Sequence, residues 1–186
     1  MFYELMTGSM NHKGTVLLST SRLILRQIIE EDAEEIYYGF RNQSAFLYYS
    51  NKEKITLEEE KRSLIGIAEK YKRKDYYNWV ITLKNGGKII GSINGYHADG
   101  IILINYAIDD RYKGNGFMTE ALIKVNDFFI NEIKIKKVEC GCVIENFASK
   151  RVMEKSKMKY EGIIEGYVKL KDGYHDMHLF SLESGD

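Results

Sequence analysis

Alternating apolar and polar residues mark the first regular segment of the chain. The run RLILRQI (Arg22–Ile28) has a period of two and predicts a β-strand. The segment EDAEEIYYGFRN that follows predicts a short helix. A second helix is predicted from Thr56, because Thr56 and Glu59 have the spacing of a capping box. Its apolar residues recur at helical spacing, and they are Leu57, Leu64, Ile67, Ala68 and Tyr71.

From Tyr76 onward the pattern changes to β-rich runs separated by turn signals. Two runs in YYNWVITLKNGGKIIGSINGYH flank Asn85-Gly86-Gly87, which is a typical hairpin signal. A third run, Ile101–Asp109, follows a turn at Asp99-Gly100. Together these runs predict an antiparallel meander.

The C-terminal third returns to helices and strands in alternation. A helix is predicted after Gly116 by one apolar stripe, whose members are Phe117, Ala121, Leu122, Val125, Phe128 and Phe129. The run Lys136–Ile144 predicts a buried strand, and ENFASKRVMEKSK predicts a helix with Asn146 as its N-cap. Two final strands around Lys171-Asp172-Gly173 predict another hairpin.

The resulting order, β-α-α-β-β-β-α-β-α-β-β, predicts an α/β fold with a mixed, mostly antiparallel sheet and flanking helices. The strand–helix–strand unit from Ile101 to Ile144 is expected to pair its strands in parallel, since a helical crossover favours that arrangement. We expect residues 1–19 to form a flexible leader and residues 20–186 to form a single domain.

The charge balance narrows the classes of partner. The chain has 27 Lys and Arg residues against 27 Asp and Glu residues, so it lacks the basic footprint of a nucleic-acid-binding protein. No apolar stretch is long enough to cross a bilayer, and the N-terminus does not resemble a signal peptide. These features predict a cytoplasmic protein that binds neither nucleic acid nor membrane.

The cysteines and histidines suggest neither a disulfide nor a metal site. Cys140 and Cys142 are two residues apart in a predicted strand, where a disulfide between them is geometrically unfavourable. We expect both to be reduced and packed in the strand. His175 and His178 provide two ring nitrogens without a cysteine partner nearby, so no metal is predicted.

The segment DRYKGNGFMTEAL (Asp110–Leu122) places cations and glycines between a predicted strand and a predicted helix. The first backbone N–H groups of a helix lack partners within the helix and lie at the positive end of its dipole. Gly114 and Gly116 let the backbone approach a ligand closely, and Arg111 and Lys113 add positive charge. The segment therefore predicts a phosphate or pyrophosphate socket. A tight turn with two solvated cations is the alternative.

Two further stretches make the chain resemble the GNAT superfamily of acetyl-CoA-dependent N-acetyltransferases. R-x-x-G-x-G at a strand–helix junction (Arg111–Gly116) is similar to the cofactor motif of that family. The N-x-x-S…M-E-K segment, Asn146–Lys155, is similar to its next conserved block. The opening SRLILR and the closing GYHDMHLFSL resemble the Rim-type branch, which includes acetyltransferases of ribosomal-protein N-termini. The resemblance spans about Thr20 to Leu182 and implies a sheet with a splayed parallel strand pair.

The resemblance also implies which residues bind acetyl-CoA or CoA. The pantetheine arm would lie between Ile104–Asp109 and Cys140–Ile144, with Asn146 holding it and Ser149 beside the thioester sulfur. A backbone N–H near Ala107 or Ile108 would stabilise the oxyanion. The pyrophosphate would lie on the loop, whose implied binding residues are Arg111, Lys113, Gly114, Asn115, Gly116, Phe117 and Met118.

Side-chain acids and bases are missing from the usual family positions, which are Leu103, Gly141 and Met153 in this chain. Ser149 remains as a donor on the thiol side. Glu165 is a candidate base, although strand parity favours a surface carboxylate instead. His97, expected in a loop, is a weaker candidate, and Asn105 is placed to position a water molecule.

The sequence leaves the acceptor amine open between a protein N-terminus and a small molecule. In this fold the early helices roof the acceptor site, and the tyrosine pairs Tyr37-Tyr38, Tyr48-Tyr49 and Tyr76-Tyr77 lie in or beside them. Ordinary packing is the alternative for these pairs. The acidic run Glu58-Glu59-Glu60 suits a polyamine or, more simply, a solvated helix face.

Two functions other than N-acetyl transfer are also considered for this loop. An acyl-CoA-binding module with little catalysis would use the same residues. A nucleotide-phosphate-binding protein is disfavoured, because the chain has no Walker-type lysine. The chain is expected to be a monomer or a homodimer.

Overall fold

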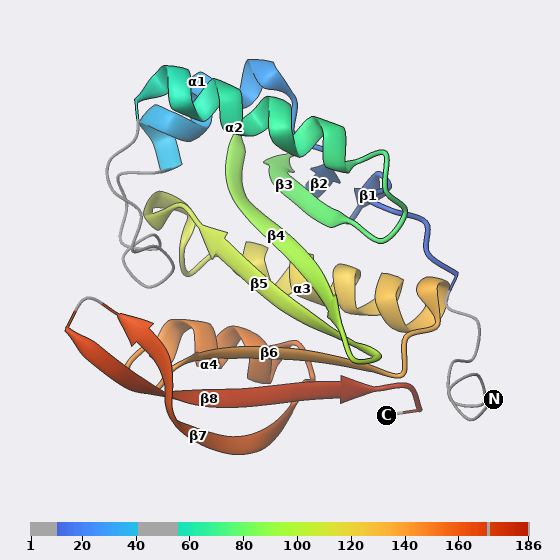
Figure 1. The fold of residues 1–186 in the computed structure, drawn as a ribbon, viewed down its shortest axis with the longest axis vertical. Helices are drawn as coiled ribbons and strands as arrows, with labels where there is room; N and C mark the ends of the chain where they lie inside the picture. The colour runs from blue at the N-terminus through green and yellow to red at the C-terminus, as the bar shows by residue number, and fades with distance from the viewer. Residues whose placement is uncertain (1–10, 41–55, 171, 186) are drawn as a thin grey trace.

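The computed structural model describes residues 11–40, 56–170 and 172–185 (Figure 1). Its centre is an eight-stranded sheet in the order β1-β2-β3-β4-β5-β6-β8-β7. The only parallel pair among these strands is β5 with β6, and the other neighbours are antiparallel. The strands are β1 (Leu18–Ser19), β2 (Leu23–Arg26), β3 (Tyr77–Leu83), β4 (Ile89–Ala98), β5 (Ile101–Ile108), β6 (Lys137–Val143), β7 (Lys159–Leu170) and β8 (Gly173–Glu183).

Helices cover both faces of this sheet (Figure 1). Helix α1 (Ala33–Glu35) is one turn between a 3₁₀ turn at Glu30–Asp32 and a π turn at Ile36–Phe40. With α2 (Leu57–Lys70) it packs on one face, while α3 (Phe117–Asp127) and α4 (Phe147–Lys155) pack on the other. The predicted mixed α/β fold with one parallel pair is confirmed.

Helix boundaries follow the local signals in the sequence. Thr56 Oγ1 accepts a hydrogen bond from Glu59 N at 3.2 Å, and the Glu59 carboxylate accepts one from Thr56 N at 2.7 Å. This is the predicted capping box of α2. Asn146 caps α4 by accepting from Ser149 N at 3.1 Å, as predicted.

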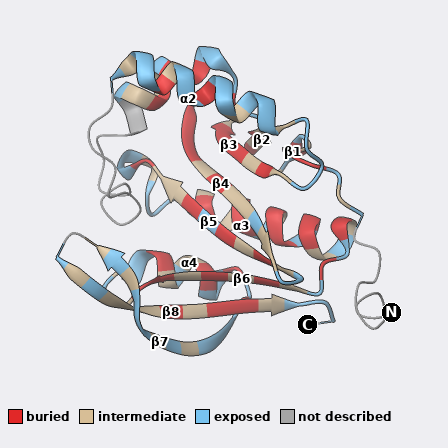
Figure 2. Cartoon of the chain, in the orientation of Figure 1, coloured by how far each residue is buried: buried red, intermediate tan, exposed pale blue. Residues whose placement is uncertain are grey.

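The main core lies between the sheet and α3. The residues of the predicted α3 stripe after Phe117 are all fully buried, and a π turn at Phe128–Ile133 continues the helix (Figure 2). Phe129 packs edge-on against Tyr77 at 4.9 Å between ring centroids, and Phe128 packs against Trp79 at 5.8 Å. Full burial of such side chains supplies the main driving force for folding.

The described part of the predicted leader packs on the domain. Thr15 and Leu18 are buried, and Trp79 Nε1 donates a hydrogen bond to Val16 O at 2.6 Å. Strand β1 also pairs with β2, with Leu18 opposite Leu25. The residues before them also contact the domain, since Asn11 N donates to Ile133 O at 3.0 Å and His12 Nδ1 lies 2.7 Å from the Tyr77 hydroxyl. Residues 11–19 are therefore held by the domain, and a flexible leader stays a prediction only for residues 1–10.

Two other sequence expectations need correction. His97 lies within β4 and not in a loop, because its strand extends as far as Ala98. Glu60 is buried on α2, whereas Glu58 and Glu59 are exposed, so only part of the acidic run is a solvated face. The predicted pair Tyr48-Tyr49 lies outside the described residues.

Candidate active site

The parallel strands β5 and β6 separate halfway along their length. They pair from Ile101 opposite Lys137 to Ile104 opposite Cys140, and no further. Beyond that point β5 stays paired with β4, and β6 stays paired with β8. The two ribbons accordingly diverge in Figure 1. This is the splayed parallel pair that the family resemblance implied.

A cavity of about 260 Å³ opens where the strands separate. Its walls are the end of β5, the loop before α3, the first turn of α3, and α4 along its length. Predicted cofactor-binding residues line most of it, namely Ala107, Ile108, Lys113, Gly114, Gly116, Phe117, Met118, Asn146 and Ser149. Other lining residues could not be assigned from their sequence motifs, and they are Tyr106, Tyr112, Thr119, Ala148, Arg151, Val152 and Lys155.

The loop at Lys113–Gly116 needs its two glycines for conformational reasons. Gly114 has a φ of +78° and Gly116 has a φ of +76°, both in the left-handed region. Gly116 is also the N-cap of α3, so the unpaired N–H groups of the first turn lie at the cavity wall. The arrangement suits an anion, because these donors add to the positive end of the helix dipole.

A brace between β2 and α3 holds this loop from behind. The Glu120 carboxylate accepts hydrogen bonds from the Thr20 and Ser21 hydroxyls and from Arg22 N and Nε. Arg22 donates in turn to Asn115 O at 3.0 Å, and its guanidinium lies 4.4 Å from the Phe117 ring centre. Neither Arg22 nor Glu120 has a role that its sequence pattern predicts, although Arg22 is part of the SRLILR motif.

The brace also changes the acidity of Glu120. Burial raises the pKa of this carboxyl, but the hydrogen bonds from Thr20, Arg22 and Ser21 outweigh it and lower the pKa to about 2. The carboxylate is therefore charged at any physiological pH, and the loop is anchored to a permanent negative charge.

Two predicted cofactor residues do not line the cavity. The Arg111 guanidinium forms an ion pair with the buried carboxylate of Asp109, and Arg111 N also donates to it at 2.8 Å. The Asn115 side chain donates to Tyr112 O at 3.2 Å and Lys113 O at 3.1 Å. Both side chains shape the loop, so their direct contact with a ligand stays a prediction.

Ser149 is the polar centre of the cavity wall opposite the loop. It is buried in the first turn of α4, where the N-cap Asn146 fixes its backbone. Its Oγ lies 2.8 Å from the Tyr106 hydroxyl, and its side chain also hydrogen-bonds the Cys142 thiol. Burial raises the pKa of Cys142, and this hydrogen bond offsets part of the rise.

The three usual acid/base positions hold no ionisable side chain. Met153 is fully buried in the core. At Gly141 a Cβ would lie only 2.6 Å from Met177 Sδ, so β8 already fills the space a side chain would need. Leu103 is on β5, on the face opposite Tyr106, because side chains alternate along a strand.

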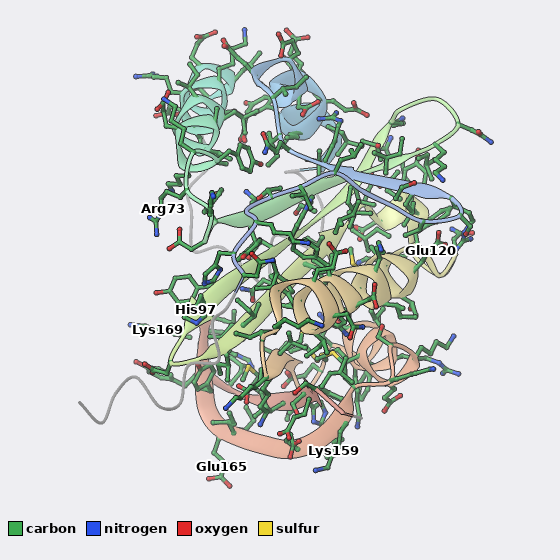
Figure 3. All side chains as sticks on the ribbon, turned by 90° about the vertical axis from the view of Figure 1, so that its right-hand side faces the viewer. Arg73, His97, Glu120, Lys159, Glu165 and Lys169 are labelled. Atoms are coloured by element: carbon green, nitrogen blue, oxygen red, sulfur yellow. The ribbon has the colours of Figure 1, made fainter. Side chains whose placement is uncertain are left out.

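The remaining base candidates lie away from the cavity. Glu165 is exposed on the edge strand β7, and Figure 3 shows it projecting outward from the protein. The β7–β8 register shifts between Ile164 and Val168, and Glu165 lies within that irregularity. His97 lies opposite Ile102 at the paired end of β5, whereas the cavity is at the other end.

The described residues hold neither a metal-binding cluster nor a membrane-spanning helix. No three His, Cys, Asp or Glu side chains in this part of the chain converge to hold a metal ion. None of the helices found there is both long and apolar enough to span a bilayer. Cys140 and Cys142 are free and buried, as predicted.

Comparison with known proteins matches this geometry to one family. The profile of an acetyltransferase (GNAT) domain matches residues 22–159. The uncharacterized N-acetyltransferase YoaA of Bacillus subtilis is 28% identical over 170 residues, covering 89% of this chain and 96% of YoaA.

Solved structures agree in fold. The ribosomal-protein-S5-alanine acetyltransferase of Vibrio fischeri superposes with a TM-score of 0.80 at 21% identity, covering 92% of this chain and 98% of that protein. RimL, a ribosomal L7/L12 alpha-N-protein acetyltransferase in complex with coenzyme A, superposes with a TM-score of 0.79 at 18% identity. The match covers 90% of this chain and 98% of RimL. The chain belongs to the GNAT family and is an acetyl-CoA-dependent acetyltransferase.

Proposed function

We propose that the protein transfers the acetyl group of acetyl-CoA to the α-amine of a peptide or protein N-terminus. The amine attacks the thioester directly while both substrates are bound. The observation that carries this proposal is a row of neutral amide side chains on the side of β5 that faces away from the cavity.

Three asparagines lie directly opposite one another on three adjacent strands. Asn78 of β3 is opposite Asn94 of β4, and Asn94 is opposite Asn105 of β5. Opposite residues on neighbouring strands share one face of the sheet. Val80, two residues after Asn78 on β3, packs in one cluster with Leu64 of α2. Because alternate residues of a strand share a face, this asparagine row (Asn78, Asn94, Asn105) lies on the face that α2 covers.

The asparagine row lies on the side from which an acceptor has to approach. Asn105 and Tyr106 are successive residues of β5, so their side chains point to opposite faces. Tyr106 lines the cavity, and Asn105 is exposed on the other side. An amine that attacks a thioester held in the cavity has to reach it past the end of β5, where the pairing of β5 with β6 has ended.

The chemistry of this surface suits a peptide better than a polycation. An asparagine side chain offers both a donor and an acceptor, as a peptide group does. A polyamine requires carboxylates, since charge-assisted hydrogen bonds dominate its recognition. Among the described residues of β3, β4 and β5 that lie beside the gap on this face none is an acid, and they are Asn78, Ser92, Asn94, Tyr96, Leu103, Asn105 and Ala107. The acid on the β6 side, Glu139 opposite Leu103, forms an ion pair with Lys137 at 3.1 Å.

The absence of an acid or base at the three usual family positions is also compatible with an α-amine acceptor. An α-amine has a pKa near ~8 and is roughly a tenth neutral at pH 7, whereas a lysine-type amine near ~10.4 is almost entirely charged. An α-amine thus needs little help to lose its proton, and water can take it. A site without ionisable groups at Leu103, Gly141 and Met153 is compatible with that acceptor.

Within this proposal the cavity residues have distinct roles. Backbone N–H groups of residues 113–118 bind the pyrophosphate, and Asn146 holds the pantetheine arm. The N–H of Ala107 or Ile108 stabilises the oxyanion, and Ser149 donates to the sulfur. Because Cys140 and Cys142 are free thiols, the proposed location is the cytoplasm.

The test is release of free CoA thiol from acetyl-CoA in the presence of different amines. Peptides that begin with Ala or Ser, spermidine and aminoglycosides are compared, and the peptides are expected to be the best acceptors. Asn105→Ala should raise the peptide KM about 3- to 10-fold, the loss of one hydrogen bond, with unchanged acetyl-CoA affinity. Asn131→Ala, an exposed amide on the π turn after α3, is the matched control.

Two results would contradict the proposal. Faster turnover of spermidine than of any peptide would show that the acceptor is a polycation and not a peptide α-amine. Tight acetyl-CoA binding without thiol release on any amine would favour the acyl-CoA-binding module.

A further inference from the structure

Tyr106 places a hydroxyl group beside Ser149 in the cavity wall. Its Oη lies 2.8 Å from Ser149 Oγ and 3.1 Å from Ser149 O. Both residues are largely withdrawn from solvent, with Tyr106 7% and Ser149 6% exposed. Both also line the cavity, so this hydroxyl pair lies at the surface where the thioester is expected.

The backbone fixes the position of this hydroxyl pair from two sides. Tyr106 is two residues beyond Ile104, the last residue of β5 that pairs with β6. Ser149 is in the first turn of α4, where its N–H donates to Asn146 Oδ1 at 3.1 Å. A strand and a capped helix therefore hold the two oxygens in contact, and neither depends on a mobile loop.

The Tyr106 hydroxyl contacts Ser149, one turn before Met153 on α4. Met153 is the position on this helix where the family resemblance implied an acid or base. Met153 is fully buried and carries no proton to donate. The side chain of Tyr106 comes from the opposite wall and contacts the first turn of the same helix.

We propose that Tyr106 is a positioning residue that acts through Ser149 on the leaving CoA sulfur. In the free protein the Tyr106 hydroxyl donates to Ser149 O at 3.1 Å, and either hydroxyl can donate in the 2.8 Å contact with Ser149 Oγ. With acetyl-CoA bound, Tyr106 donates its one hydrogen to Ser149 Oγ, which directs the Ser149 hydrogen away from Tyr106. In the free protein the Cys142 thiol is a partner of the Ser149 side chain. With acetyl-CoA bound, the sulfur takes the place of that partner.

The step balances without any further reactant. The bond between the acetyl carbon and sulfur breaks, and its electron pair goes to the sulfur. The sulfur takes the Ser149 proton, and Ser149 takes the Tyr106 proton. The attacking amine releases one proton to water, and water returns one to Tyr106. This inference rests on the proposed amine transfer for its effect on turnover, but not for its effect on bound CoA.

The first test measures bound CoA and requires no acceptor. The thiolate of CoA is followed by its ultraviolet absorbance in a pH titration of the complex, after subtraction of the free protein. Donation from Ser149 stabilises the thiolate, so Tyr106→Phe should raise the pKa of the bound thiol by about one unit. An unchanged titration in Tyr106→Phe would overturn the proposal whether or not any amine is acetylated.

The second test uses turnover and a double-mutant cycle. Tyr106→Phe should lower kcat about 10- to 100-fold with acetyl-CoA affinity within twofold of the original protein. In a Ser149→Ala background the same substitution should change kcat less than threefold, because the two residues act in series. Equal losses in both backgrounds, or weaker acetyl-CoA binding with unchanged kcat, would make Tyr106 only part of the wall.

A matched control separates loss of this hydroxyl from loss of any tyrosine hydroxyl. The Tyr160 hydroxyl also has a hydrogen-bond partner, His178 Nδ1 at 3.1 Å, but Tyr160 does not line the cavity. Tyr160→Phe should leave the titration of bound CoA and kcat unchanged. Failure of the amine proposal alone would appear as no turnover by the original protein, with the CoA titration still shifted by Tyr106→Phe.

Discussion

The two sides of strand β5 are built in different ways. The cavity side is assembled mainly from two short stretches, 106–119 and 146–155, and each contains a recognisable motif. The opposite side takes one asparagine from each of three strands, at positions 78, 94 and 105. A phosphate socket can be local because it needs only the N–H groups at the start of one helix. An acceptor surface depends on strand register and so has no linear motif.

The largest expected effect tests the cavity side at Gly116. Gly116→Glu forces a left-handed conformation on a residue with a Cβ, at a cost of about 1–2 kcal/mol. It also places a carboxylate where the pyrophosphate is expected. We expect acetyl-CoA affinity, measured by calorimetry, to fall at least about 100-fold, which corresponds to about 2.8 kcal/mol.

A second glycine provides the control for that substitution. Gly100, in the turn between β4 and β5, has a φ of +84° and open space around it, at the far end of β5 from the cavity. Gly100→Glu should lower stability by a similar strain and leave acetyl-CoA affinity intact. If both variants lose affinity equally, backbone strain and not the anion socket explains the result.

The next effect tests the opposite side of β5 at Asn105. Asn105→Asp adds a carboxylate to a face on which the described residues of β3, β4 and β5 beside the gap have none, and the acid on the β6 side, Glu139, is paired with Lys137. We expect the ratio of kcat/KM for spermidine to kcat/KM for a peptide to rise about tenfold, since 1.4 kcal/mol of added attraction has that effect. Acetyl-CoA affinity should not change. An unchanged ratio, or the same change in Asn131→Asp, would show that Asn105 does not contact the acceptor.

A smaller effect is expected at Glu120, in the brace behind the cavity loop. With a pKa lowered from 4.5 to about 2, this carboxylate contributes stability that is present above pH 4.5 and lost as the pH falls towards 2. The contribution is about 3 kcal/mol by linkage, and acid titration of the unfolding free energy should show it.

Glu120→Gln should flatten that part of the pH profile and raise the acetyl-CoA KM about fivefold, because the loop loses its anchor. Glu132→Gln serves as the comparison, since Glu132 forms an exposed ion pair with Lys13. If Glu120→Gln leaves the acid dependence of the unfolding free energy unchanged, another carboxylate is responsible for that dependence.

The smallest effect is expected at Glu165. Because it is exposed on β7 outside the cavity, Glu165→Gln should leave kcat and its pH dependence within twofold of the original. Loss of the acidic limb of the pH–rate profile in this variant would instead make Glu165 the base and remove the argument for a base-free acceptor side.

Most of the elements could be predicted from the sequence, because their signals are local. The capping box at Thr56 and Glu59 and the cap at Asn146 are formed as predicted. The stripe that includes Val125 and Phe128 is buried as predicted. The strand β1 was missed because two residues are too short to show a period, and its pairing with β2 depends on tertiary contact.

The residues of the candidate site also divide into those with a local sequence signal and those without one. Gly114, Gly116, Asn146 and Ser149 could be found because they belong to motifs. Tyr106 and Glu120 could not, since a tyrosine in an apolar strand and a glutamate on a helix are unremarkable until their partners are known. The partners of Glu120 lie about a hundred positions away along the chain.

By itself the sequence determined the order of most elements and the glycine-rich turn before α3, because periodicity, caps and glycine conformations act over a few residues. The family was recognisable from the resemblance of short motifs such as Arg111–Gly116 and Asn146–Lys155. Only the tertiary structure decided which hydroxyl meets Ser149, that Met177 fills the space at Gly141, and that Glu165 projects outward. Each of these depends on the register between strands, including the irregularity in β7, and register is set by packing of the whole sheet.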